Sequence, residues 1–260
     1  MNIHDFKIAG PVQILPCKIC SAPSPLYGVV DFNKNCEAIR GLALPKSGVL
    51  VGYNRCPDCG FLFTPAFDGW GHEEYGQAIY NDEYAIVDPD YKQIRPAGNA
   101  GMLTKMFWAD KGSLSLLDYG GGNGVLADTL ARNGFQSAAT YDPFNPAFAE
   151  LPARRFNIVS CFETLEHVPD PLAQIAAIAK CVADKGLVIF STLVQPADFD
   201  KEGLDWWYVG PRNGHISLFS KEALAQAWRR QGFSFGSFSS NLHIACRELP
   251  AFARHLMRGA

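Results

Sequence analysis

The sequence predicts an α/β fold in which a small β module precedes a larger domain built on a mostly parallel sheet. Beyond residue 112, apolar runs of strand length alternate with helical patterns, which is typical of parallel strands joined by crossover helices. The first 72 residues are instead rich in Cys, Pro and Gly, and their short apolar pieces flank turns. At 260 residues, with 48% hydrophobic and 19% charged residues, the chain has room for one sizeable core and one minor unit.

The elements of the larger domain follow from local patterns. Strands are predicted over 114–119, 137–142, 156–162 and 186–192, followed by an antiparallel pair over 233–239 and 242–247. Helices are predicted over 125–133, 172–183 and 221–231, the last starting after Ser220 as N-cap and stopping before Gly232. The stretch between Asp142 and Phe156 is too short for a full helix and strand and contains Pro152, so one βα unit is predicted to be abbreviated there.

Three domain-sized segments result from these patterns. Residues 1–72 form the predicted β module, and residues 112–260 form the predicted α/β domain. Residues 73–111 contain aromatic and polar residues in short helical patterns, and we expect a helical connector or lid there.

The overall charge disfavours nucleic acid as a partner. A formal net charge of -3 gives no basic field with which to neutralise phosphates. The N-terminal residues carry no apolar run of signal-peptide length, and nowhere do about 18 uncharged apolar residues follow one another. We therefore expect a cytoplasmic protein without a membrane partner; the oligomeric state is left open.

Four of the eight cysteines form two C-x-x-C pairs with the spacing of a metal site. The pairs are Cys17 with Cys20 and Cys56 with Cys59, separated by 35 residues. Four thiolates suit tetrahedral Zn²⁺ and leave it no open position, so the predicted zinc is structural. A redox pair is the alternative, and Cys36 is an alternative ligand.

A second motif, DYGGGNG, follows the first strand of the larger domain and indicates a Rossmann-like nucleotide site. Glycines allow a ligand to approach the backbone closely, and the helix that begins at Val125 offers free N–H groups. Asp142, at the end of the next strand, is placed to accept hydrogen bonds from two ribose hydroxyls. Gly122, Gly124 and Ala127 also match G-x-G-x-x-A, so the glycines alone do not separate a nicotinamide cofactor from another adenosine cofactor.

The motifs DYGGGNG, TYDPFN, FNIVSCFETLEHVPDP and GHISLFSKEALAQAWRRQGF occur in that order. Over about residues 112–240 the chain thereby resembles the class I methyltransferases, in particular the small-molecule group labelled type 11, 12 or 23. The resemblance implies that S-adenosylmethionine is the methyl donor. The chain departs from the family in the shortened stretch after Asp142, which leaves the adenine contacts open.

The resemblance also implies which residues hold the cofactor. The glycine turn and its neighbours would hold the methionyl and ribose parts, Asp142 the ribose, and the end of the third strand the methionyl side near the sulfonium. Residues of the connector, Tyr80, Tyr84 and Arg95, are candidates to close over the cofactor, with packing between domains as the alternative. The predicted cofactor residues are Asp118, Tyr119, Gly120, Gly121, Gly122, Asn123, Gly124, Asp142, Pro143, Phe144, Cys161, Phe162, Glu163, Tyr80, Tyr84 and Arg95.

The catalytic candidates lie near the ends of the strands. The loop DWWYVGPRNGHISLFS follows the strand 186–192 and supplies Tyr208 and His215, of which His215 has a side chain suited to proton removal near neutral pH. Glu163 and His167 are further candidates. For His215, and for Glu163, Glu166 and His167, a purely structural role in bracing loops or capping a helix remains the alternative.

A four-cysteine module before a class I domain is similar to sugar C-methyltransferases of deoxysugar pathways and to certain ribosomal RNA methyltransferases. We predict a methyltransferase that acts on a small molecule such as a sugar or nucleotide-sugar, on oxygen or carbon. An RNA methyltransferase that uses the zinc module for recognition is the first alternative. A nicotinamide-dependent or catalytically silent Rossmann protein is the second.

Overall fold

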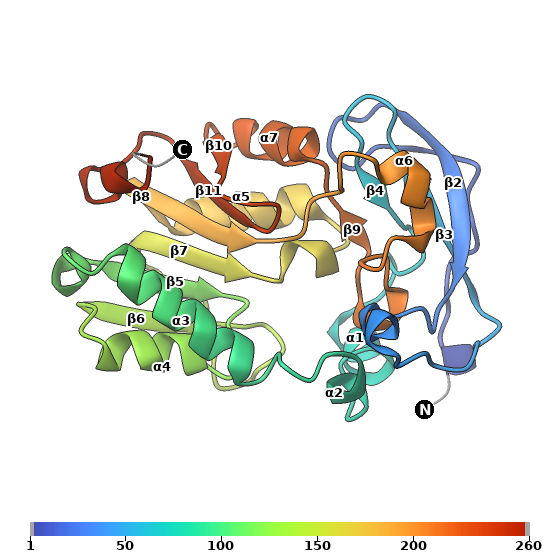
Figure 1. Ribbon diagram of the computed structural model, residues 1–260, viewed down its shortest axis with the longest axis horizontal. Helices are drawn as coiled ribbons and strands as arrows, with labels where there is room; N and C mark the ends of the chain where they lie inside the picture. The colour runs from blue at the N-terminus through green and yellow to red at the C-terminus, as the bar shows by residue number, and fades with distance from the viewer. Residues whose placement is uncertain (1–2, 258–260) are drawn as a thin grey trace. The chain divides into compact units, whose positions relative to one another are not determined.

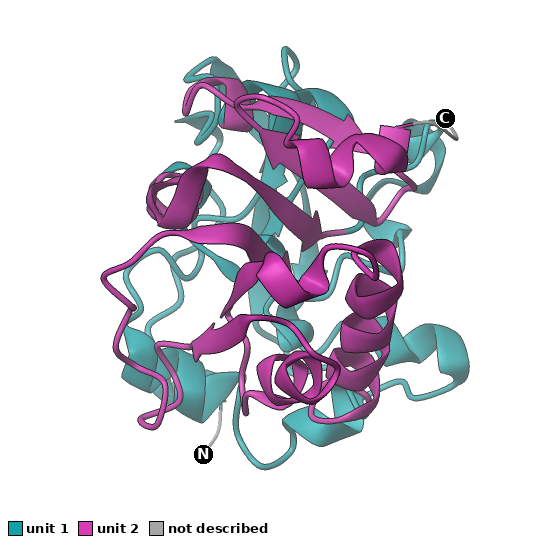
Figure 2. Ribbon diagram, turned by 90° about the vertical axis from the view of Figure 1, so that its left-hand side faces the viewer, with its two compact units in different colours: residues 1–89, 165–172, 193–227 teal, residues 90–164, 173–192, 228–260 magenta. Residues whose placement is uncertain are grey.

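A computed structural model describes residues 3–257, and their contacts divide the chain into two compact units (Figure 2). The first unit comprises Met1–Pro89, Leu165–Leu172 and Leu193–Ala227. The second comprises Asp90–Thr164, Ala173–Thr192 and Trp228–Ala260. Two stretches that follow the glycine motif in sequence thus belong to the first unit. Within residues 3–257, no helix combines the length and apolar character that crossing a bilayer requires.

The second unit contains the predicted, mostly parallel sheet (Figure 1). Its six strands are ordered β10-β11-β8-β7-β5-β6. Strands β6, β5, β7 and β8 run parallel to one another, and β11 pairs antiparallel with β8 and with β10. The bounds are β5 Ser115–Tyr119, β6 Ser137–Tyr141, β7 Phe156–Phe162, β8 Val182–Ser191, β10 Ser234–Ser237 and β11 Leu242–Cys246. The predicted fold class is confirmed.

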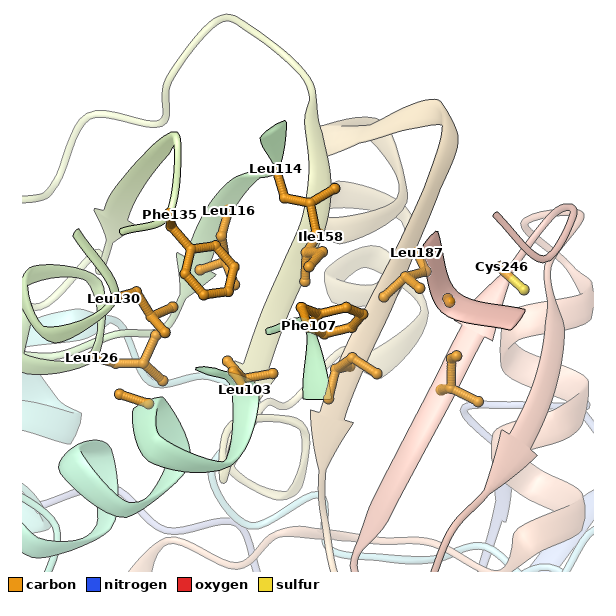
Figure 3. Packing of buried hydrophobic residues seen from close by; sticks show 14 residues of the cluster. Leu103, Phe107, Leu114, Leu116, Leu126, Leu130, Phe135, Ile158, Leu187 and Cys246 are labelled. Atoms are coloured by element: carbon orange, nitrogen blue, oxygen red, sulfur yellow. The ribbon is translucent and has the colours of Figure 1, made fainter. Parts of the chain in front are cut away.

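Helices pack on this sheet through residues at helical spacing. Helix α3 (Ile94–Met106) buries Ala100 and Leu103 together with Phe107 just beyond its end, and α4 (Val125–Arg132) buries Leu126 and Leu130. These side chains form one cluster with apolar residues of β5, β7, β8 and β11 (Figure 3). The core therefore fixes the strands whose carboxyl ends carry the glycine motif and Glu163.

Local features of the chain refine the sequence expectations. Between β6 and β7 the described chain contains neither helix nor strand, which confirms the abbreviated βα unit and leaves β6 at the sheet edge. Helix α5 (Pro171–Cys181) ends earlier than predicted, and β8 begins at once, because the β-branched Val182 pairs with Phe156. The predicted helix 221–231 is α7 (Lys221–Arg229), and Ser220 Oγ accepts the backbone N–H of Ala223 as an N-cap.

The first unit contains a five-stranded antiparallel sheet in the order β1-β2-β3-β4-β9. Its strands are β1 Ile14–Pro16, β2 Pro23–Asp31, β3 Leu50–Arg55, β4 Leu62–Phe63 and β9 Ser217–Leu218. Three short helices follow in the same unit: α1 His72–Ala78, α2 Tyr84–Val87 and α6 Phe199–Glu202. Strand β9 lies more than 150 residues after β4 in the chain, so the small sheet is completed by a distant segment.

Candidate functional site

The glycine turn between β5 and α4 presents bare backbone. Gly120, Gly122 and Gly124 have φ values of 78°, 55° and 77°, the left-handed region that favours glycine. A Cβ on Gly120 would lie 2.6 Å from Thr164 Oγ1, so this position has no room for a side chain. A Cβ on Gly122 would meet no heavy atom within 4 Å. The turn is therefore tight on one side and open at Gly122, as close approach of a ligand requires.

Asp142 follows directly after β6, and its carboxylate is fixed beside the turn. The backbone N–H of Gly122 donates to Oδ2 at 2.8 Å, and the N–H of Phe144 donates to Oδ1 at 2.8 Å. Each carboxylate oxygen has two lone pairs, so one acceptor position on each remains for a second donor. This carboxylate fits the two vicinal hydroxyls of a ribose.

The segment that replaces the missing βα unit closes against the turn. Asn145 Nδ2 donates to the carbonyl of Gly122 at 2.9 Å, and the N–H of Asp142 donates to the carbonyl of Phe148 at 3.0 Å. The ring of Phe144 is 47% exposed beside Asp142, where a flat apolar ligand can stack. Sequence reasoning named Phe144 and missed Asn145 and Phe148. The turn-forming sequence DPFNP was the available signal.

Asp118 has a different environment from Asp142. Its side chain is buried in β5 and accepts a hydrogen bond from Ser160 Oγ at 2.7 Å. Burial raises the pKa of Asp118 to about 7, against the opposing effect of the Ser160 hydrogen bond. The carboxylate thus supports the turn from within the sheet. Tyr119 is also buried and packs on Tyr141, with ring centroids 4.8 Å apart.

A cavity of about 230 Å³ opens at the carboxyl ends of β7 and β8 in the same unit. Its lining brings together residues from α3, from the two strand ends and from the β10–β11 hairpin: Arg95, Asn99, Met102, Phe162, Glu163, Ser191, Ser239, Asn241 and Leu242. In open α/β sheets ligands bind at this edge. Of the predicted cofactor residues, Arg95, Phe162 and Glu163 line the cavity, whereas Cys161 is fully buried within β7.

Glu163 is held in an unusual conformation at the cavity. Its φ of 49° is left-handed, which is uncommon for a non-glycine residue and costs of order 1–3 kcal/mol. Ser191 Oγ accepts the N–H of Glu163 at 2.9 Å and donates to its Oε1 at 2.6 Å. The carboxylate is therefore fixed in place. Sequence reasoning missed Ser191, although it lies at the end of the neighbouring parallel strand.

The remaining connector residues belong to the other unit. Tyr80 and Tyr84 lie in the first unit, whereas Arg95 lies in the second. Tyr84 is buried, and its hydroxyl donates to the carbonyl of Asn213 at 3.3 Å. The Tyr80 ring packs on Tyr84, with centroids 5.1 Å apart. Both tyrosines thus contribute to packing within the first unit.

The other catalytic candidates gather in the first unit around Glu166, a residue that was not among the predicted site residues. The Tyr208 hydroxyl donates to Glu166 Oε1 at 2.5 Å, and Glu166 is fully buried. The His167 and His215 rings lie with centroids 4.9 Å apart. Cys36 Sγ lies 3.5 Å from His215 Nδ1. Three of the four predicted catalytic residues are thus brought together, and Glu163 lies in the other unit.

The four predicted zinc ligands converge in the first unit. The Sγ–Sγ distances are 3.6 Å for Cys17–Cys59, 3.4 Å for Cys20–Cys56 and 3.7 Å for Cys20–Cys59. Zn–S bonds of ~2.3 Å in a tetrahedron place sulfur atoms ~3.8 Å apart, so the four thiols fit Zn²⁺ with little movement. A hydrogen bond from Cys59 lowers the pKa of Cys17 to about 5, which favours a thiolate in the cluster.

Comparisons with known proteins bear on the family of this chain. A family described as "Methyltransferase domain" matches residues 91–235. The ubiquinone biosynthesis O-methyltransferase of Neisseria meningitidis is 33% identical over 110 residues, covering 33% of this chain and 46% of the relative. The protein of the same name from Vibrio cholerae is 36% identical over 101 residues, covering 30% and 41%. The chain thus spans less than half the length of these relatives.

Among solved structures, an O-methyltransferase family protein from Burkholderia thailandensis aligns with a TM-score of 0.46 and 14% identity, covering 61% of this chain and 58% of the other. The family match includes the glycine turn, Asp142 and the cavity carboxylate Glu163. Because that match extends over more than half of the chain, the protein belongs to the class I S-adenosylmethionine-dependent methyltransferases.

Proposed function

We propose that this protein transfers the methyl group of S-adenosylmethionine to a small molecule. The observation that carries the proposal is the pairing of an open, left-handed glycine turn with a carboxylate fixed for two further donors at Asp142. The relatives are named O-methyltransferases, which favours transfer to oxygen. The sulfonium of the bound cofactor supplies an electrophilic methyl group, and the protein supplies alignment.

The cofactor residues follow from the geometry of the second unit. We propose that Asp142 binds the ribose hydroxyls. The Gly120–Gly124 turn, which includes Asn123, would contact the methionyl and ribose parts through its backbone, and Phe144 with Pro143 would contact the face of the adenine ring. Arg95, as a cation lining the cavity, suits the methionyl carboxylate. Asp118, Tyr119 and Cys161 would support these contacts from within the sheet rather than touch the cofactor.

The acceptor is proposed to be a small polar compound. The cavity of about 230 Å³ also has to hold the methionyl end of the cofactor beside Arg95, and its other walls combine apolar groups with amide, hydroxyl and carboxylate groups. A sugar or nucleotide-sugar fits this polarity, as does a hydroxylated aromatic ring. Binding screens with the methyl donor present would distinguish these acceptors.

Some methyl acceptors have to lose a proton during the transfer. For such an acceptor the proposed general bases are Glu163, His215, Tyr208 and His167. Glu163 is supported by its cavity position and its fixed carboxylate. His215 is supported by its ring chemistry, which suits proton transfer near neutral pH. A well-ionised acceptor would require no base.

We further propose a structural Zn²⁺ on Cys17, Cys20, Cys56 and Cys59, supported by sulfur distances close to those of a tetrahedral site. RNA as the acceptor remains the second candidate function, because zinc modules also accompany RNA methyltransferases. The net charge of -3 weighs against it.

Calorimetry with S-adenosylmethionine, its demethylated product and NAD tests the cofactor. Both methyl-donor forms should bind, and Asp142→Ala should weaken binding by about 1–3 kcal/mol because hydrogen bonds to the ribose are lost. Asp184→Ala is the matched control, because Asp184 is exposed near the start of β8, whereas the cavity lies at the carboxyl end of that strand. Binding of NAD alone would overturn the proposal.

A further inference from the structure

A second group of metal-ligand side chains lies in the first unit, separate from the four cysteines. One carboxylate oxygen of Glu166 and one ring nitrogen each of His167 and His215 all lie within 4.8 Å of one another. We propose that these three residues bind a divalent first-row transition-metal ion. Two of these residues, His167 and His215, were proposed above as proton acceptors, and the test of the metal site requires neither methyl donor nor methyl acceptor.

The hydrogen bonds of the two histidines indicate which ring nitrogen is available to a cation. His215 Nδ1 lies 2.8 Å from the carbonyl of Tyr208, and His167 Nδ1 lies 3.2 Å from the carbonyl of Gly214. A carbonyl oxygen only accepts, so each Nδ1 carries the proton of its hydrogen bond. In the neutral ring the lone pair then lies on Nε2. Metal-bound histidines in proteins have this arrangement, in which a backbone carbonyl orients the ring.

The carboxylate is oriented by its neighbours as well. Glu166 is fully buried, and the Tyr208 hydroxyl donates to Oε1 at 2.5 Å. The backbone carbonyl of Glu166 accepts the N–H of Ile216 at 2.9 Å, which joins the 3-10 helix Leu165–His167 to the segment that carries His215. All three side chains therefore have a second interaction that fixes their position, as the ligands of a preorganised site do.

A buried carboxylate requires a positive charge close by. Two cations of the same unit are engaged with other groups: Lys34 donates to the carbonyls of Trp206 and Val209, and Arg212 donates to the carbonyl of Ile79 and to Asn81 Oδ1. A metal ion held by both rings would compensate the charge of the Glu166 carboxylate.

The donor set selects the kind of ion. Two imidazoles and one carboxylate suit zinc, iron(II), cobalt or manganese, whereas calcium and magnesium prefer oxygen donors throughout. Three protein ligands leave a coordination position open, in contrast to the closed four-sulfur site. Water or a hydroxyl bound there would become more acidic. The ion would occupy the Nε2 that His215 needs as a general base, so the two roles exclude each other.

Metal loading of the whole protein tests the proposal. Protein stripped with a chelator under reducing conditions is titrated with Co²⁺, followed by elemental analysis and absorption spectroscopy. We expect two ions per chain, one giving thiolate-to-cobalt charge-transfer bands and one giving only weak ligand-field bands. The double variant His167→Asn/His215→Asn should lose the second ion and keep the thiolate bands, which also report that the first unit is folded.

Two further variants complete the test. Tyr208→Phe removes the hydrogen bond to the Glu166 carboxylate and should weaken the second ion about 10–100-fold without removing it. His72→Asn, which lies outside both clusters, should bind two ions like the unaltered protein. If the protein binds only one equivalent of cobalt, and binding is complete when the thiolate bands saturate, the proposal is wrong. Persistence of the second ion in a folded His167→Asn/His215→Asn variant would overturn it too.

Discussion

Two carboxylates beside the glycine turn show how single residues of two neighbouring motifs acquire different chemistry. Asp142 lies at the end of its strand and receives two backbone N–H groups, so its charge is compensated locally. Asp118 lies within β5, where desolvation outweighs its one hydrogen bond from Ser160 and raises its pKa to about 7. Sequence position alone assigned both to the cofactor. Burial thus gives the two carboxylates different environments, and the proposed role of Asp118 is to support the turn from within the sheet.

The raised pKa of Asp118 predicts a pH dependence of stability. A carboxyl whose pKa rises from 3.8 to about 7 on folding binds its proton more tightly in the native state. Its contribution to the unfolding free energy is therefore fully present below pH ~4 and is lost as the pH rises towards 7. Asp118→Asn should remove this part of the slope. Urea unfolding of the ligand-free protein between pH 5 and 8 measures it, and equal slopes in both proteins would contradict the prediction.

His215 carries the second prediction at this scale. Asparagine can keep the donor that Nδ1 offers to the Tyr208 carbonyl but lacks Nε2. If Nε2 takes part in the reaction, His215→Asn should lower turnover about 100-fold while the affinity for the methyl donor stays nearly unchanged. Steady-state kinetics with an identified acceptor, alongside calorimetry with the demethylated product, separate the two effects. Full activity across neutral pH would leave His215 a purely structural role.

At the scale of elements, regular patterns were predictable and irregular connections were not. Strand β7 was predicted to the residue and α4 to within one residue, because apolar spacing and caps are local signals. The pairing of β9 with β4 was not predictable, since two-residue strands carry no periodicity and their contact is long-range. The surroundings of Glu166 were not predictable either. In the sequence it has the pattern of an ordinary residue at a helix start, and only the fold brings Tyr208 and His215 to it.

The two cysteine knuckles are local elements with matching backbones. In each, the residue after the second cysteine is left-handed: Ser21 with φ 68° and Gly60 with φ 71°. Each also has the N–H of that residue donating to the carbonyl of the first cysteine, Cys17 or Cys56. The turn geometry is thus set by backbone bonds, and the second knuckle uses glycine for it.

Gly60→Ala tests this geometry. A Cβ there would be strained by the positive φ and would lie 3.1 Å from the Ser220 Cβ, so the unfolding free energy of the first unit should fall by about 1–2 kcal/mol. Gly69→Ala is the control, because its Cβ would meet nothing within 4 Å. Chemical denaturation of metal-loaded protein, followed by the thiolate-to-metal absorption, compares them. A loss no larger for Gly60→Ala than for Gly69→Ala would contradict the prediction.

At the scale of the whole molecule, the first unit is assembled from three separate stretches of chain. Hydrogen bonds join them: Ser220 Oγ donates to the carbonyl of Cys59 at 2.5 Å, and Lys18 Nζ donates to that of Pro169 at 2.9 Å. Both Lys18 and Cys59 lie at the cysteine knuckles. The four-cysteine site therefore anchors residues 165–172 and 193–227 as well as the N-terminal segment, and the predicted catalytic residues His167, Tyr208 and His215 lie in those anchored stretches.

Removal of the metal should therefore affect more than the N-terminal segment. Without an ion, four thiols gathered within a few ångströms lose the bonds that hold two chain segments together. After chelation, amide hydrogen exchange should rise in residues 10–64 and also in 193–220, whereas strands β5 and β7 should stay protected because their core is their own. Cys59→Ser should reproduce the pattern, and the buried cysteine change Cys246→Ser in the second unit should not. If exchange rises only in residues 10–64, the loop that carries His215 is held by its own contacts and the prediction is wrong. Elemental analysis that finds no metal before chelation would remove the basis of the prediction.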